Sequence, residues 1–253
     1  MKYVLALFLL SFLLLVPLSH ADYIVTGINT TMSLNLNASA QVVEIFKVSV
    51  TNTSVSQYTT DRLALNFTLS QWQNIIGPSL VEHIVNPRGS VYNFNFIPGP
   101  ITSSNNGKLA TLILSYTASN VTTVNQTGPR VFLYKFNNAV LNYQNAESGE
   151  VLGQNTSLTI ILPPNSRILT AFPNPDFPVL GFTKNYQNVT TLSWSSDEPL
   201  SKFTLNYDVQ QSLQNEVTEF FSSAYGYLGN FIYLIIIVVI ALIIFYAYLK
   251  SEK

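Results

Sequence analysis

The alternation of apolar and polar positions divides the chain into three parts. A period of two dominates residues 22–211, which predicts β-strands with one buried face. From Ser212 the apolar positions recur at helical spacing, and residues 231–249 then contain no charge, amide, glycine or proline. We therefore expect a β-rich body, a helical stalk and one long apolar helix, in that order.

The body begins with its clearest hairpin signal. Alternating residues at 32–36 and a longer run at 41–52 flank a turn at 37–39. In the longer run, Glu44 occupies the same register as Phe46 and several valines. The pattern predicts two paired strands.

Further strands are expected along the rest of the body, separated by turn residues. Ser70 is expected to cap a short helix that ends at Gly77. The polar stretch 120–129 is expected to be a linker, and the last two strands are expected to form a hairpin. The expected strands are 63–69, 80–85, 90–97, 108–118, 130–136, 139–143, 157–162, 190–194 and 202–209.

Short strands with turn residues between them predict a mainly β fold. We expect an antiparallel β-sandwich, with two Ig-like lobes preferred over one large sandwich, which is the alternative. No internal repeat distinguishes the two arrangements. The expected domains are a signal peptide at 1–21, a first lobe at 22–122, a second lobe at 129–210, a juxtamembrane helical stalk at 212–230, a transmembrane helix at 231–249 and a cytoplasmic tail at 250–253.

The N-terminus has the features of a secretory signal peptide. Lys2 precedes an apolar run at 4–16, which Pro17 interrupts. Ser19 and Ala21 provide the small residues that a signal peptidase requires. We expect cleavage after Ala21, and an uncleaved N-terminal anchor is the alternative.

Residues 231–249 predict a membrane-spanning helix. As a helix, these 19 residues are about 28 Å long, close to the hydrocarbon thickness of a bilayer. Lys250 and Lys253 follow, and positive charge favours the cytoplasmic side. We therefore expect a single-pass protein of the plasma membrane, with the lipid bilayer as partner, its N-terminus outside and its C-terminus in the cytoplasm.

Composition narrows the class of protein. The net charge is −1, only 10% of the residues are charged, and there is no cysteine. Without a basic patch, nucleic acid is not expected as a partner. The lack of cysteine favours a prokaryotic surface over a disulfide-stapled eukaryotic one, and the content of isoleucine, tyrosine and asparagine favours an archaeal surface.

Eight Asn-x-Ser/Thr sequons occur, against about five in a chain of random order. We expect several to be glycosylated, because none lies in the expected signal peptide or membrane span. The alternative is that asparagine and threonine simply occupy turns and solvent-facing positions. The candidate glycosylation residues are Asn29, Asn37, Asn52, Asn66, Asn120, Asn125, Asn155 and Asn188.

No residue pattern predicts catalysis, a metal site or a cofactor site. His83 is the one histidine after the expected signal peptide, and we expect a partly buried or surface residue. The carboxylates of Glu147, Glu150 and Asp197 have no recognisable calcium-ligand spacing. The chain is therefore not expected to be an enzyme, and no catalytic residue, metal ligand or cofactor is assigned.

Aromatic residues allow two further interpretations. Trp72 and Trp194 are expected in the core rather than as sugar-stacking platforms. The proline-rich stretch 173–178 is expected either to bind a partner or to cap one end of the sandwich.

These patterns together predict a single-pass, N-glycosylated cell-surface protein. Its extracellular β-domain is expected to serve adhesion, envelope organisation or protein–protein interaction, through a protein partner or self-assembly on the outer face. The alternative is an accessory subunit of a membrane complex for export, glycosyl transfer or respiration. An enzyme or a solute-binding module is the least favoured class.

Overall fold

The computed structural model describes most of the chain after the expected signal peptide. The expected signal peptide at 1–21 and the sequon residues Asn66 and Asn188 lie outside the described residues. The described residues are 23–64, 68–104, 107–146, 149–178, 186–187, 189–195, 198–229 and 231–251.

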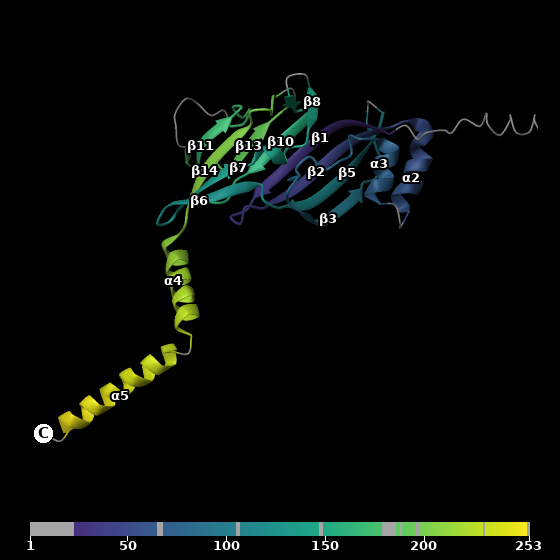
Figure 1. The fold of residues 1–253 in the computed structure, drawn as a ribbon. Helices are drawn as coiled ribbons and strands as arrows, with labels where there is room; N and C mark the ends of the chain where they lie inside the picture. Colours follow the sequence, from purple (N-terminus) through teal and green to yellow (C-terminus); the bar gives the residue numbers. More distant parts are fainter. Residues whose placement is uncertain are drawn as a thin grey trace, which may run out of the picture.

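Strands make up most of the described body, and helices stand at its two ends (Figure 1). The strands are β1 (Tyr23–Leu34), β2 (Ala40–Val50), β3 (Val91–Pro98), β4 (Thr102–Ser104), β5 (Gly107–Ala118), β6 (Thr122–Gly128), β7 (Val131–Phe136), β8 (Gln144–Ala146), β9 (Gly149–Val151), β10 (Thr156–Ile161), β11 (Ser166–Phe172), β12 (Tyr186–Gln187), β13 (Thr191–Trp194) and β14 (Thr204–Gln210). The helical segments are η1 (Asn52–Ser54), α2 (Val55–Leu63), α3 (Leu69–Ile76), η2 (Asn138–Val140), α4 (Leu213–Leu228) and α5 (Phe231–Ser251).

The described strands form two main sheets. The larger sheet has the order β13-β10-β1-β2-β5-β3, with β4 also paired to β5. The second sheet has the order β12-β11-β14-β7-β6, and β8 pairs with β9 in a small ribbon. The expectation of a mainly β, sandwich-like fold is therefore confirmed, and so is the first hairpin, which β1 and β2 form.

One pairing makes the larger sheet mixed rather than antiparallel throughout. β1 pairs in parallel with β10, from Ile28 opposite Thr156 onwards. This pairing places strands from the stretches 22–122 and 129–210, which are expected to be separate lobes, in the same sheet. The division into two lobes remains a prediction.

Some local expectations are wrong, because the backbone partners lie elsewhere. The stretch 120–129 is not a linker, since it contains β6, which pairs with β7. Strands β13 and β14 do not form a hairpin, since they belong to different sheets. The stretches 80–85 and 139–143 are not regular strands: η2 occupies Asn138–Val140, and Ile84 and Leu141 form only an isolated bridge with each other.

The helices near the N-terminal half are partly as expected. The short helix is confirmed as α3, but it begins two residues earlier, where Thr68 and Gln71 form a capping box. The expected strand 63–69 is wrong at both described ends, because Leu63 ends α2 and Leu69 begins α3.

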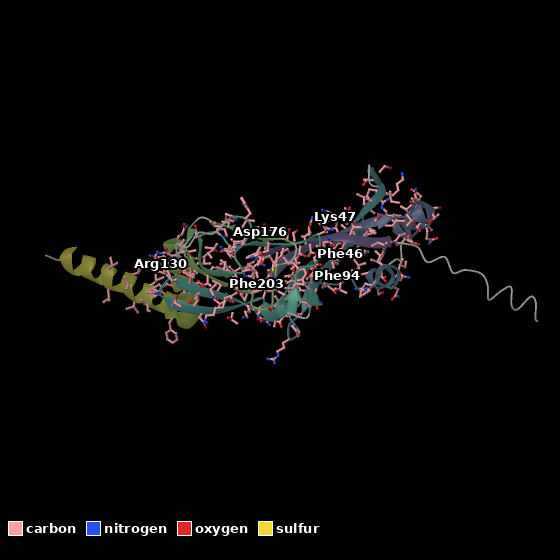
Figure 2. The ribbon with its side chains drawn as sticks, turned by 90° about the horizontal axis from the view of Figure 1, so that it is seen from above. Phe46, Lys47, Phe94, Arg130, Asp176 and Phe203 are labelled. Carbon is pink, nitrogen blue, oxygen red and sulfur yellow. The ribbon has the colours of Figure 1, made fainter. Side chains whose placement is uncertain are left out.

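One cluster of buried apolar side chains includes residues of both sheets and of α3. On β2, Phe46 is fully buried whereas the adjacent Lys47 is exposed, as the period of two requires (Figure 2). Trp72 and Trp194 are both buried, and Trp194 packs edge-to-face against Phe203 with ring centroids 5.0 Å apart. The expectation that both tryptophans belong to the core is confirmed.

Helices α4 and α5 extend away from the β-body, at the end opposite α2 and α3 (Figure 1). The expected helical stalk is confirmed as a helix, α4. Gly229 joins α4 to α5 with φ +45°, a conformation that glycine adopts without strain. Across this joint the hydroxyl oxygens of Tyr225 and Tyr233 lie 3.2 Å apart. Within the described part of the chain, no helix qualifies as a membrane span by its length and hydropathy together.

Candidate functional site

The candidate site is built around Glu44, a fully buried carboxylate on the core-facing side of β2. The same alternation that buries Phe46 also buries Glu44, because both belong to one register of the strand. A carboxylate in an apolar interior is destabilising unless hydrogen-bond donors surround it. The partners of Glu44 therefore decide what this site can do.

Three donors reach the Glu44 carboxylate. The backbone N–H of His83 donates to Oε1 at 2.8 Å, and ring Nδ1 of His83 donates to Oε2 at 2.7 Å. The hydroxyl of Tyr116, on the neighbouring strand β5, donates to Oε1 at 2.5 Å and accepts from the backbone N–H of Ile84 at 3.0 Å. Glu44 and Tyr116 thus provide the hydrogen-bond partners that a neighbouring strand would provide, so the segment 80–85 lies on the sheet without becoming a strand.

A second group of residues packs against His83. The ring of Tyr143 lies 4.9 Å from the His83 ring, centroid to centroid. The backbone N–H of Tyr143 donates to Oε1 of Glu150 at 2.5 Å, and the backbone N–H of Asn142 donates to the His83 carbonyl at 2.8 Å. Segments 80–85 and 140–143, both without regular secondary structure at the contact, are therefore held to each other and to the sheet through His83.

Burial determines how the surrounding groups titrate. Burial, and next the charge of Glu44, raise the pKa of the Tyr116 and Tyr143 hydroxyls well above the ordinary value. Burial also raises the pKa of Glu150, although the hydrogen bond from Tyr143 N–H and the charge of His83 act in the opposite direction. Both hydroxyls therefore remain neutral at physiological pH.

A cavity of about 730 Å³ lies beside His83. Its walls come from β1, from the turn that precedes β10, and from the segments that hold His83. Two of the walls meet closely: the backbone N–H of Ile28 donates to the carbonyl of Asn155 at 3.1 Å, and a Cβ at Gly27 would lie 2.9 Å from that same oxygen. No lysine, arginine, aspartate or glutamate is found among the described residues that line this cavity.

His83 is among the residues that line this cavity, and its ring has a second nitrogen, Nε2. When the ring is neutral and Nδ1 donates to Glu44, Nε2 is a hydrogen-bond acceptor. The structure gives Nε2 no hydrogen-bond partner within the described residues, and this atom is not among the fully enclosed unpartnered ones. His83 lines the cavity although its exposed fraction is only 6%.

Two other hollows lie nearer the start of α4, and the buried carboxylate that lines one of them, Asp208, is paired with Arg167. One, of about 530 Å³, adjoins the ion pair of Arg167 with Asp208. The other, of about 680 Å³, is mainly apolar and lies beside Tyr134, whose hydroxyl donates to the carbonyl of Leu36 at 3.1 Å. Because of the Glu44–His83 pair, the cavity beside His83 is the strongest candidate for a functional site.

The described sequon residues do not converge on one site. Asn29 is half-buried in β1, and its side chain accepts a hydrogen bond from Ser157 at 3.1 Å. Asn155 is notable because it lies at the rim of the His83 cavity. The exposed sequon residues are Asn37, Asn52, Asn120, Asn125 and Asn155.

The proline-rich stretch 173–178 lies along β13, at one edge of the larger sheet. Phe177 and Ser193 exchange backbone hydrogen bonds, and the indole N–H of Trp194 donates to the carbonyl of Pro173 at 2.9 Å. Asp176 accepts from the backbone N–H of Ser195 at 2.8 Å (Figure 2). This stretch therefore covers the β13 edge, and Phe177 remains 68% exposed on its outer side.

From the sequence, His83 was expected to be a partly buried or surface residue, whereas the structure buries it. Glu44 was not selected as a candidate. A signal was present, because Glu44 occupies an apolar register in the most regular strand of the chain. The partners Tyr116 and Tyr143 carried no such signal, since tyrosine is common in sheet cores.

Comparisons with known proteins give a distant structural likeness. No protein-family model matches the chain, and no curated protein matches it in sequence. The chain is similar to the folded domain of the LppM protein of Mycobacterium tuberculosis, solved by NMR, with a TM-score of 0.28 and 7% identity, over 75% of this chain and 91% of that chain. A likeness at this level assigns no function.

Proposed function

We propose that this protein is a single-pass membrane protein that displays its β-body on the outer face of the cell for interaction with a partner protein or with further copies of itself. The main observation that supports this proposal is that α5 is helical from Phe231 to Ser251 and has no charged residue from 231 to 249. The β-body and α4 both precede α5, so a span at α5 would leave them on the same side of the membrane.

The exposure of α5 supports a lipid environment. Each residue from Ile235 to Ile240 is about half exposed, so apolar surface lies on all sides of the helix. Exposed apolar surface of this extent is unfavourable in water and favourable in the hydrocarbon of a bilayer. Tyr233 near the start of α5 is in the place where an amphipathic ring prefers the membrane boundary.

The edges of the larger sheet support an interaction role for the body. The stretch 173–178 covers β13 at one edge, whereas β3 at the other edge has exposed apolar side chains at Tyr92, Phe94 and Ile97. Figure 2 labels Phe94 on this strand. β3 contains no charged residue, and an uncharged open edge is suited to pairing with a strand of another chain.

Glycosylation of the exposed sequons is part of the same proposal. Asn37, Asn52, Asn120 and Asn125 are exposed in the folded protein, which supports this part of the proposal. Intact-mass measurement of native protein tests this: we expect a mass above that of residues 22–253 by whole sugar units. An observed mass equal to that of the unmodified residues would remove the proposed glycosylation.

The topology is tested with membranes from cells that produce the full chain with a C-terminal epitope. We expect the protein to stay in the membrane pellet at alkaline pH and to be released by detergent. Protease added to intact cells is expected to remove the β-body and leave the epitope protected. Release by alkaline washing, or loss of the epitope in intact cells, would contradict the proposal.

Crosslinking in native membranes distinguishes the two classes of partner. Contacts between copies through β3 support lateral assembly, and one fixed stoichiometric partner supports an accessory subunit of a membrane complex. The double variant Y92S/F94S is expected to reduce the crosslinked species in either case. Phe172, which is 51% exposed away from β3, offers the matched control F172S.

A further inference from the structure

We propose that the cavity beside His83 is a binding site for a neutral carbohydrate, with Nε2 of His83 as the hydrogen-bond acceptor for a sugar hydroxyl. The cavity volume of about 730 Å³ lies within the range of about 300–1,000 Å³ that holds small ligands in proteins, and accommodates one or two sugar rings. The proposal does not depend on where α5 lies, so it can fail independently of the proposed function.

The chemistry of the lining favours a neutral polyhydroxylated ligand. Hydroxyls and amides at the cavity, among them Ser79, Asn142 and Gln154, both donate and accept hydrogen bonds. No described lining residue is a lysine, arginine, aspartate or glutamate, so a charged ligand would lose its hydration without gaining an opposite charge. Ile28 and Val81 add apolar surface, which suits the C–H face of a sugar ring.

His83 is held in place before a ligand arrives. Its Nδ1 bond to Glu44 and the contact with the Tyr143 ring fix both the tautomer and the plane of the imidazole. An acceptor that is already oriented and largely buried loses little conformational entropy on binding and forms a stronger hydrogen bond than one in water. The cavity therefore contains one polar group whose orientation is determined by the protein and whose accessible nitrogen has no partner within the described residues.

Two substitutions separate the binding role of His83 from its structural role. In H83N, the side-chain amide nitrogen takes the position of Nδ1, so the bond to Glu44 is kept and Nε2 is removed. In H83Q, the longer side chain takes a polar atom towards the position of Nε2, and the bond to Glu44 is lost. Sugar binding is expected to fall at least tenfold in H83N and to be partly kept in H83Q, whereas thermal stability is expected to fall more in H83Q.

The test uses the full chain, produced without N-glycans and held in a detergent with no sugar headgroup. Methyl glycosides of glucose, galactose, mannose and N-acetylglucosamine are added and observed by saturation-transfer NMR. We expect one or more to bind with a dissociation constant of about 1 mM or weaker. The protein has two histidines, and His20 belongs to the expected signal peptide, so the ring signal of labelled His83 reports directly on the cavity.

Asn155 at the rim allows the source of the sugar to be distinguished. If the protein's own glycan occupies the cavity, glycosylated protein is expected to bind no added glycoside, and glycosylated N155Q to bind it. If the ligand comes from elsewhere, both are expected to bind. Absence of binding to all four glycosides in the glycan-free chain, or equal binding by wild type and H83N, would overturn the proposal.

Discussion

Tyr116 and Glu44 lie on adjacent strands of the larger sheet, and their side chains meet through a hydrogen bond of 2.5 Å from the Tyr116 hydroxyl to Oε1. The same hydroxyl accepts the backbone N–H of Ile84. Tyr116 therefore links the buried carboxylate of Glu44 to the backbone of the segment 80–85, which belongs to neither main sheet. Several measurable consequences depend on this arrangement.

Glu44→Ala is expected to destabilise the protein by about 3–5 kcal/mol, because it leaves the donors of His83 and Tyr116 buried without an acceptor. Glu44→Gln keeps one acceptor oxygen and is expected to lose less. Equilibrium denaturation of the full chain measures both. Glu82→Gln, a half-buried neighbour of His83, is the control and is expected to change the stability by less than about 0.5 kcal/mol.

Tyr116→Phe is expected to lower the stability by about 1–3 kcal/mol, because it removes a donor from Glu44 and an acceptor from the backbone N–H of Ile84. Hydrogen exchange at the amide of Ile84 is expected to accelerate in this variant. Tyr92→Phe, on the exposed edge strand β3, is the matched control and should leave both measurements unchanged. A protected Ile84 amide in Y116F would contradict the assigned role.

Glu150 is expected to give the stability a dependence on pH. Burial raises its pKa above the ordinary value of 4.5, so the folded state holds this proton more tightly than the unfolded state. The contribution of Glu150 to stability is therefore complete below pH 4.5. It is lost as the pH rises from 4.5 to the raised pKa. Melting temperatures of Glu150→Gln should show a shallower fall over this interval than those of the wild type, whereas E82Q should retain the wild-type slope.

A charge in the middle of α5 is expected to weaken membrane retention if α5 spans the bilayer. Val238→Arg introduces a side chain whose insertion is less favourable by about 2.5–3.5 kcal/mol near the helix centre. The fraction of protein released by alkaline washing should rise in V238R. Val238→Ala changes the size of the same side chain without charge and should behave as the wild type. Equal retention of both variants would argue against a span.

The sequence predicted elements well where the signal is local. The hairpin of β1 and β2, the strand β5 and the helix α3 all follow from periodicity and turn residues. The helix α2 was missed because the stretch 55–63 has no continuous apolar stripe, and only Tyr58 and Asp61 are buried in it.

The pairing of strands and the hydrogen-bond partners of loops were less predictable, because they depend on residues far apart in the chain. Alternation at 80–85 is indistinguishable from that of a strand, yet its hydrogen bonds go to Glu44 and Tyr116 rather than to a ladder. Similarly, nothing in 191–194 or 204–210 shows that these two strands belong to different sheets. The candidate cavity was hidden for the same reason, since its walls come from segments that are distant in sequence.

The parallel contact between β1 and β10 has a consequence for biosynthesis. Thr156 lies opposite Ile28 in this pairing. One edge of β1 therefore has no partner strand until 128 residues beyond Ile28 have been synthesised. Contacts across such a separation make folding slow, since the intervening loop must close before the contacts stabilise it. The N-terminal hairpin is therefore expected to need protection from neighbouring nascent chains until the second half of the polypeptide has emerged.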